Sequence, residues 1–224
     1  MPTIKLKPSK RAKAVLAAFV VASGSAGVYI SQTGDTDTKN LPVMVEVFPG
    51  QPPVPDDVAL AINKLVKPWE GRSLKAYLDR LPTRPRWTVC DGDTENVTPG
   101  MVETPQGCDR RVAVKMVRDY RPVLAQKIKG WEHMPLSWRA MMDSLAWNIG
   151  ADAAVKSTAA RLGEAALAKG DDKLFFKSCE AATAYNRSGG RFIVGLGKRR
   201  GMGDATRIGE GELCVSGLDE GAAK

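Results

Sequence analysis

Two carboxylic acids and a threonine are the residues of this sequence best suited by type and spacing to carry out chemistry. Glu70 follows a predicted helix, Asp79 lies on a predicted strand shortly after it, and Thr88 lies on the next predicted strand. A pair of carboxyl groups can act as general acid and general base, and cleavage of a glycosidic bond needs such a pair. Glu70 is the candidate acid, because a helix C-terminus and the neighbouring Trp69 ring both favour an uncharged carboxyl group. Asp79 is then the candidate base.

The elements that must position these residues follow from hydrophobic spacing. Apolar residues at helical spacing predict a helix that Asp56 and Asp57 cap and that ends at Gly71. Residues 74–94 mix strand-forming side chains with proline and glycine, which predicts a short, irregular β-ribbon. The ribbon would hold Asp79 close to the end of the first helix.

A long helix is predicted next, over residues 104–129, opened by Pro105 and kinked by Pro122. Three further helices are expected over 136–150, 158–169 and 171–184. The predicted fold class is α+β, with a small lobe that carries the ribbon, a long connecting helix and a mostly helical lobe.

The N-terminus has the layout of a membrane-directed segment. Residues 14–30 carry no charge and follow a cluster of five basic residues. As a helix this run would be about 26 Å long, close to the thickness of a hydrocarbon core. It is either a signal peptide, cleaved at a small-residue site, or an uncleaved anchor that can later leave the inner membrane. A buried core helix is disfavoured by the basic flank. Both main interpretations export the rest of the chain to the periplasm.

Composition shifts divide the chain into four parts. We expect a signal or signal-anchor segment over 1–34, a proline-rich linker over 35–57, a folded domain over 58–216 and an acidic tail over 217–224. The net charge of +8 favours a polyanionic partner, such as nucleic acid, an anionic membrane or an acidic wall polymer. The basic run at 198–200 has no interleaved aromatic residues, so we do not expect nucleic acid to be the partner.

The cysteines indicate disulfides rather than a metal site. Four widely spaced cysteines in an exported chain predict two bridges, and we expect Cys90–Cys108 and Cys179–Cys214 because each keeps its loop within one half of the domain. The single histidine, His133, is far from any cysteine in the sequence, and no C-x-x-C motif is present. We therefore expect no metal and no cofactor.

Taken together, these motifs resemble the phage-type lysozymes of glycoside hydrolase family 24. The shared pattern is E-G at Glu70, Y-x-D ending at Asp79, and an aromatic residue followed by threonine at Thr88. The segments SLAWNIG (144–150), KST (156–158) and GGRFIVGLGKRR (189–200) also resemble segments of that family's C-terminal lobe, so the similarity covers roughly 58–216.

The resemblance implies a monomeric endolysin that hydrolyses the β-1,4 bond between N-acetylmuramic acid and N-acetylglucosamine in peptidoglycan and so lyses the host cell. It implies that Thr88 helps to hold the attacking water and that the anomeric configuration inverts. Trp147, Asn148 and Arg191 are candidate substrate contacts, although an aromatic residue in a helix and an arginine on a surface more often have structural or solvated roles. A lytic transglycosylase that uses Glu70 alone, or a non-catalytic wall-binding protein, is the alternative.

Three departures from the family pattern stand out. LPTRPR (81–86) lengthens the interval between Asp79 and Thr88. Asp93 stands where many relatives have histidine, which puts a structural ion pair there in doubt. The glycine-rich stretch 201–211 is longer than the corresponding part of the family's usual terminal helix, and the sequence assigns it no role.

Overall fold

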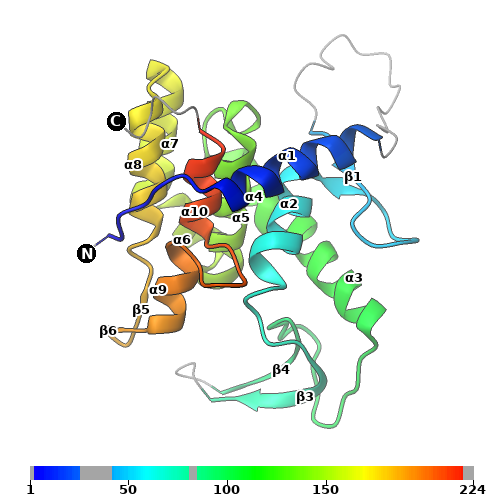
Figure 1. Cartoon of the computed structure of the whole chain (residues 1–224). Helices are drawn as coiled ribbons and strands as arrows, with labels where there is room; N and C mark the ends of the chain where they lie inside the picture. Colours follow the sequence, from blue (N-terminus) through cyan, green and yellow to red (C-terminus); the bar gives the residue numbers. More distant parts are fainter. Residues whose placement is uncertain (1–2, 26–41, 81–84, 219–224) are drawn as a thin grey trace.

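The computed structural model of the chain describes residues 3–25, 42–80 and 85–218. It confirms the α+β fold class: helices dominate, and the sheets among the described residues are antiparallel pairs of strands. Figure 1 shows a helical lobe around α7 and α8, and a smaller lobe that ends in the ribbon β3–β4. The ribbon pairs β3 (Ser73–Asp79) with β4 (Arg86–Cys90).

A segmented helix runs between the lobes, where the sequence predicts one long helix. Thr104 caps its start, since its hydroxyl accepts a hydrogen bond from the Gly107 amide at 2.9 Å. The segment changes to π-helical geometry before Pro122, as expected for a helix that must accommodate an interior proline. Its parts are α3 (Pro105–Lys115), the π-helix η3 (Met116–Tyr120) and α4 (Arg121–Lys127).

The helical lobe is built around α5 (Leu136–Ile149), which packs against helices of both lobes. The helices predicted over 136–150, 158–169 and 171–184 are present. The short helices α6, α9 and α10 and the hairpin β5–β6 are additional elements that the sequence patterns did not indicate, because none of them exceeds seven residues. The remaining elements of this lobe are η4 (Trp131–His133), α6 (Ala151–Val155), α7 (Thr158–Lys169), α8 (Asp172–Ala182), β5 (Arg187–Ser188), β6 (Arg191–Phe192), α9 (Val194–Arg200) and α10 (Glu210–Ser216).

Both expected disulfides form. Cys90–Cys108 joins β4 to α3, and Cys179–Cys214 joins α8 to α10 in the core of the helical lobe. The first bridge therefore ties β4, the strand that carries Thr88, to α3, and the second ties α8 to α10 inside the helical lobe.

The second half of the expected linker lies against the domain instead of extending away from it. β1 (Met44–Val45) pairs with β2 (Val54–Pro55), and Phe48 and Val54 are buried beside α2 (Asp56–Ala61). Burial of these apolar side chains stabilises the segment against the domain, whereas a solvated tether has no such contacts. Residues 35–41 lie outside the described residues.

Asp56 and Asp57 do not cap α2 from outside the helix, because they form its first turn and Pro55 takes the cap position. Asp57 is fully buried and accepts hydrogen bonds from Arg121, Arg139 and the Trp131 indole at 2.8–3.1 Å. The sequence indicated a cap because acidic residues often precede helices; the arginines that pair with Asp57 come from distant segments.

Asp143 on α5 is the second buried acid of this cluster. Neither of its carboxylate oxygens has a hydrogen-bond partner among the described residues. Burial, with a further contribution from nearby Asp57, raises its pKa well above the usual range despite the opposing effect of Arg121 and Arg139. Burial thus favours the neutral form of Asp143.

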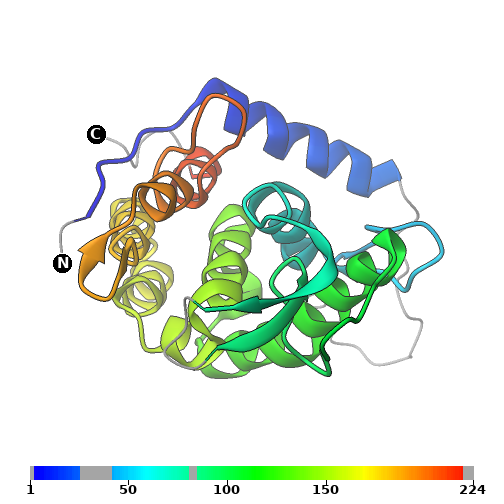
Figure 2. The same ribbon diagram turned by 90° about the horizontal axis from the view of Figure 1, so that it is seen from below.

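The N-terminal helix α1 (Lys10–Ser25) lies on the surface of the domain. Figures 1 and 2 show it along one side of the molecule, with α2 between it and the β3–β4 ribbon. Leu6 and Ala12 are buried, and Leu16 and Phe19 pack on the core of the smaller lobe. Within the described ranges, no helix combines the length and the apolar character needed to cross a membrane.

Candidate active site

Glu70 lies in the turn that follows the π-helix η2 (Ile62–Val66), which continues α2 toward the ribbon. Its backbone amide donates to the Val66 carbonyl at 3.0 Å, so the turn is anchored to the helix. The side chain is 21% exposed, and Oε1 accepts a hydrogen bond from Arg199 Nη1 at 2.6 Å. The carboxyl group is thus partly accessible and paired with a guanidinium.

Arg199 connects Glu70 to a buried acid on α10. Its Nε atom lies 3.2 Å from Glu210, which also accepts hydrogen bonds from Arg200 and from the Ser144 hydroxyl. Burial disfavours the charged guanidinium, but Glu210 and Glu70 outweigh this effect and raise the pKa of Arg199. Arg199 therefore remains cationic and holds the Glu70 side chain against the helical lobe.

The ribbon places Asp79, Tyr77 and Thr88 on one face. Tyr77 lies directly opposite Thr88 in the register, and Asp79 is two positions after Tyr77, so all three side chains point to the same side. Thr88 is buried, and its hydroxyl donates to the Arg86 carbonyl at 3.2 Å. Despite the longer interval, the threonine remains on the strand that pairs with β3.

Tyr77 connects the ribbon to Glu70 electrostatically. Partial burial raises the pKa of its phenol, and the charges of Asp79 and Glu70 raise it further. Both carboxyl groups consequently act on the same hydroxyl, although they come from different elements. Asp79 and Glu70 therefore both lie close enough to Tyr77 to act on its ionisation.

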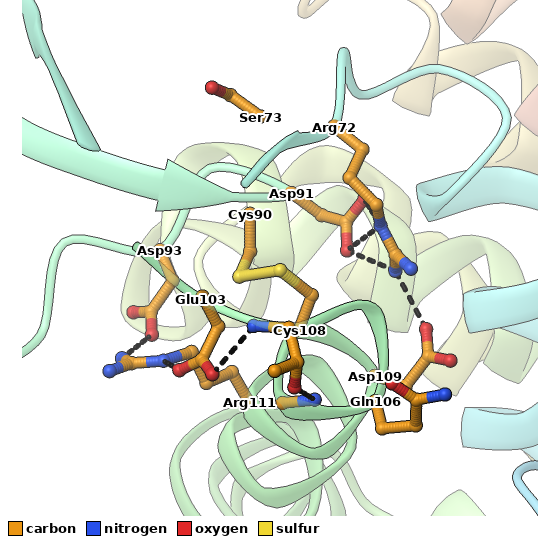
Figure 3. Close-up of a disulfide and its surroundings, with 12 residues drawn as sticks. Arg72, Ser73, Cys90, Asp91, Asp93, Glu103, Gln106, Cys108, Asp109 and Arg111 are labelled. Carbon is orange, nitrogen blue, oxygen red and sulfur yellow. Dashed lines mark hydrogen bonds and ion pairs between the residues drawn. A yellow bond between two sulfur atoms is a disulfide. The ribbon is translucent and has the colours of Figure 1, made fainter. Parts of the chain in front are cut away.

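The turn that follows β4 lies next to Glu70. A Cβ atom added at Gly92 would lie 3.7 Å from Glu70 Oε2, so this turn borders the carboxyl group. Figure 3 shows how the turn is fixed: Arg72 pairs with Asp91 and Asp109 beside the Cys90–Cys108 disulfide. The loop is therefore held by covalent and ionic contacts.

Asp93 forms ion pairs with basic side chains. The sequence had left an ion pair at this position in doubt, because many relatives have histidine there. Its carboxylate lies 2.8 Å from Arg111 and 2.6 Å from Lys115, and both cations come from α3. Burial would raise the pKa of Asp93, but these partners lower it overall. The Asp93 carboxylate thus pairs with two basic side chains of α3.

The three candidate substrate contacts are dispersed. The Trp147 ring packs on Tyr120 at a centroid distance of 5.5 Å. Asn148 is exposed and accepts a hydrogen bond from Arg200, and Arg191 is exposed on the β5–β6 hairpin. Asn148 is thus linked to Glu210 and Arg199 through Arg200, whereas Arg191 comes from a different surface element.

Sequence reasoning missed the role of Arg199. The basic run at 198–200 was apparent, but nothing in its spacing indicated that one member would pair with an acid 129 residues earlier. Within the described ranges, no three or more His, Cys, Asp or Glu side chains are grouped so that they could hold a metal ion.

Comparison with known protein families decides the relationship. A model of the phage lysozyme family matches residues 67–202, which include Glu70, Asp79, Thr88 and Arg199. This chain belongs to the phage lysozyme family. It is a glycoside hydrolase of the lysozyme type, with peptidoglycan as its substrate.

Solved structures support the phage lysozyme fold. The active form of the P1 phage endolysin Lyz is 25% identical, with a TM-score of 0.51 over 70% of this chain and 83% of that chain. The endolysin of Escherichia coli O157:H7 phage FAHEc1 is 22% identical, with a TM-score of 0.52 over 67% and 87%. The muramidase domain of SpmX from Asticaccaulis excentricus is 18% identical, with a TM-score of 0.51 over 76% and 97%. No curated protein matched the sequence.

Proposed function

We propose that this lysozyme hydrolyses the β-1,4 bond between N-acetylmuramic acid and N-acetylglucosamine, with Glu70 as general acid and Asp79 as general base. The observation that carries the proposal is that Asp79 and Thr88 share one face of the β3–β4 ribbon, while the turn directly after β4 borders Glu70, whose Oε2 atom lies 3.7 Å from the Cβ position at Gly92. Two carboxyl groups supplied by neighbouring elements are what acid–base cleavage of a glycosidic bond needs.

In the proposed reaction Glu70 donates its proton to the glycosidic oxygen as the bond to the anomeric carbon breaks. Asp79 accepts a proton from a water molecule that attacks this carbon from the opposite face, and the configuration inverts. Thr88 orients that water, since its hydroxyl faces the same side of the ribbon as Asp79. Arg199 holds Glu70 in place before the substrate binds.

Substrate contacts extend the site onto the helical lobe. We assign Asn148 to sugar binding, because it is exposed and Arg200 orients its amide. Arg191 on the β5–β6 hairpin would meet acidic groups of the peptide stems, and Trp147 would contribute an apolar surface. No cofactor, metal or nucleic acid takes part in the proposed reaction.

The proposed setting is the periplasm, where a monomeric endolysin would lyse the host cell. The uncharged run 14–30, which follows the basic cluster, supports export of the chain, either by cleavage or by release from a transient inner-membrane anchor.

The proposal is tested with the full-length chain acting on purified peptidoglycan. Glu70→Gln and Asp79→Asn each remove one proton-transfer group with little change in shape, and each should lower kcat by about a hundredfold or more. Thr88→Val should also lower kcat, whereas Thr88→Ser keeps the hydroxyl and should retain most activity. Asp152→Asn, at an exposed acid on α6, serves as the matched control and should behave like the wild type.

The two alternatives give different results in the same experiment. If Glu70→Gln is inactive while Asp79→Asn keeps wild-type turnover, the protein is a transglycosylase that uses a single acid. If the wild type binds peptidoglycan but releases no products, the enzymatic assignment is wrong.

A further inference from the structure

The glycine-rich stretch forms a defined loop, residues 201–209, between α9 and α10. Asp204 organises it: its carboxylate accepts hydrogen bonds from the amides of Thr206 and Arg207 and pairs with the Arg207 guanidinium at 2.5 Å. Gly203 has a positive φ of 73°, and a Cβ atom there would collide with the Arg207 carbonyl. Glycine is therefore required because the two sides of the loop approach each other closely.

One side of the 201–209 loop holds the residue next to the candidate acid. The Trp69 indole donates to the Ile208 carbonyl at 2.9 Å, and the Arg207 guanidinium carbon lies 3.9 Å from the centre of the Trp69 ring. Arg207 also donates to the Pro68 carbonyl at 3.4 Å. One face of the ring, the indole N–H and the preceding backbone are thus engaged by a loop 130 or more residues away in sequence.

The other side of the 201–209 loop is held by Arg11, just inside α1. Its guanidinium donates to the carbonyls of Asp204 at 2.5 Å and Met202 at 2.8 Å, and it pairs with Glu212 at 2.7 Å. Glu212 is buried and also accepts from the Ser9 hydroxyl at 2.5 Å. Figure 2 shows the loop, in orange, beside the start of α1.

We propose that the 201–209 loop is a positioning element for Glu70, with Arg207 holding Trp69 and Arg11 of the N-terminal segment holding the loop. Since Trp69 precedes Glu70, a loop that fixes the ring also fixes where the backbone presents the acid. Arg199, at the end of α9 that leads into the loop, holds the carboxylate itself. The inference rests on the proposed role of Glu70 as acid and, for Arg11, on the chain that keeps its N-terminal segment.

The test measures kcat and KM of the full-length chain on soluble peptidoglycan strands, at a temperature well below the unfolding midpoint of every variant. Arg207→Ala and Arg11→Ala should each lower kcat about tenfold with KM nearly unchanged, because a small displacement of a catalytic group slows the chemical step. Arg207→Lys keeps a cation over the Trp69 ring and should recover most of the loss. Arg161→Ala, at an exposed arginine of α7, is the matched control and should leave both constants unchanged.

A double variant tests whether the two arginines act along one path. If Arg11 acts through the loop, Arg11→Ala with Arg207→Ala should lose little more kcat than either single variant. Losses that multiply would overturn the link through the loop, and wild-type kcat in Arg207→Ala would overturn the positioning role. Glu70→Gln is assayed in parallel. Its inactivity beside a fully active Arg207→Ala rejects this inference alone, whereas an active Glu70→Gln rejects the proposed function.

Discussion

Arg199 is the residue on which the geometry of the candidate acid most depends. It is 5% exposed and pairs both with Glu70 and with the fully buried Glu210. Its removal leaves Glu210 with one guanidinium fewer in a site that water does not reach, and such losses are strongly destabilising.

We therefore expect Arg199→Ala to lower the free energy of unfolding by about 3 kcal/mol. Arg199→Lys retains a cation and should lose less, while Arg161→Ala should stay within about 0.5 kcal/mol of the wild type. Urea denaturation of the three variants measures these differences. Equal stability of Arg199→Ala and Arg161→Ala would show that the ion pairs contribute nothing net.

At the scale of elements, the buried acids where α2 packs against α5 link stability to pH. Asp143 has a raised pKa in the folded state because it is buried near Asp57, and in the unfolded chain it ionises near pH 3.9. Its contribution to stability is complete below that pH. It declines as the pH rises toward the folded-state pKa, because the unfolded state then releases a proton that the folded state keeps.

Asp143→Asn removes this titration. Relative to the wild type, the variant should gain stability as the pH rises above about 3.9 toward the folded-state pKa of Asp143, by up to about 1.4 kcal/mol per pH unit. Chemical denaturation across that range, with exposed Asp152→Asn as control, measures the slope. A stability difference that does not change with pH would mean that Asp143 is ionised in the folded protein.

Local patterns predicted the elements whose signals are strong. The positions of Glu70, Asp79 and Thr88 followed from short spacings along a helix, a turn and a ribbon, and the longer helices followed from their apolar periodicity. The pairing of Asp57 with Arg121 and Arg139 could not be predicted, since it joins segments more than sixty residues apart. The hairpin β5–β6 has two-residue strands, which are too short to give a pattern.

At the scale of the whole molecule, the N-terminal segment is part of the folded surface. α1 packs against α10, and Ala12 of α1 is completely buried, while Val20 on the same helix is 59% exposed. From the sequence alone, an apolar segment with a basic flank indicates membrane targeting. The sequence could not show that this segment packs on the domain, because its hydrogen-bond partners Thr183 and Glu212 are far away along the chain.

We expect Ala12→Asp to release α1 from the domain, because an unpaired carboxylate is costly to bury in that contact. Trypsin should then cleave after Arg11 and Lys13 about tenfold faster than in the wild type, since the segment opens more often. Val20→Asp introduces the same charge on the exposed side and should not change the rate. Equal cleavage of both variants would show that α1 is not held by this contact in solution.

The most direct test of the proposed activity is the chemical identity of the new chain ends. Purified peptidoglycan is digested with the full-length wild-type protein, the products are reduced with borohydride, and the reduced sugar is identified by mass spectrometry. Hydrolysis on the reducing side of N-acetylmuramic acid should leave muramitol at every new end after reduction. Anhydromuramic acid ends, or glucosaminitol in place of muramitol, would contradict it.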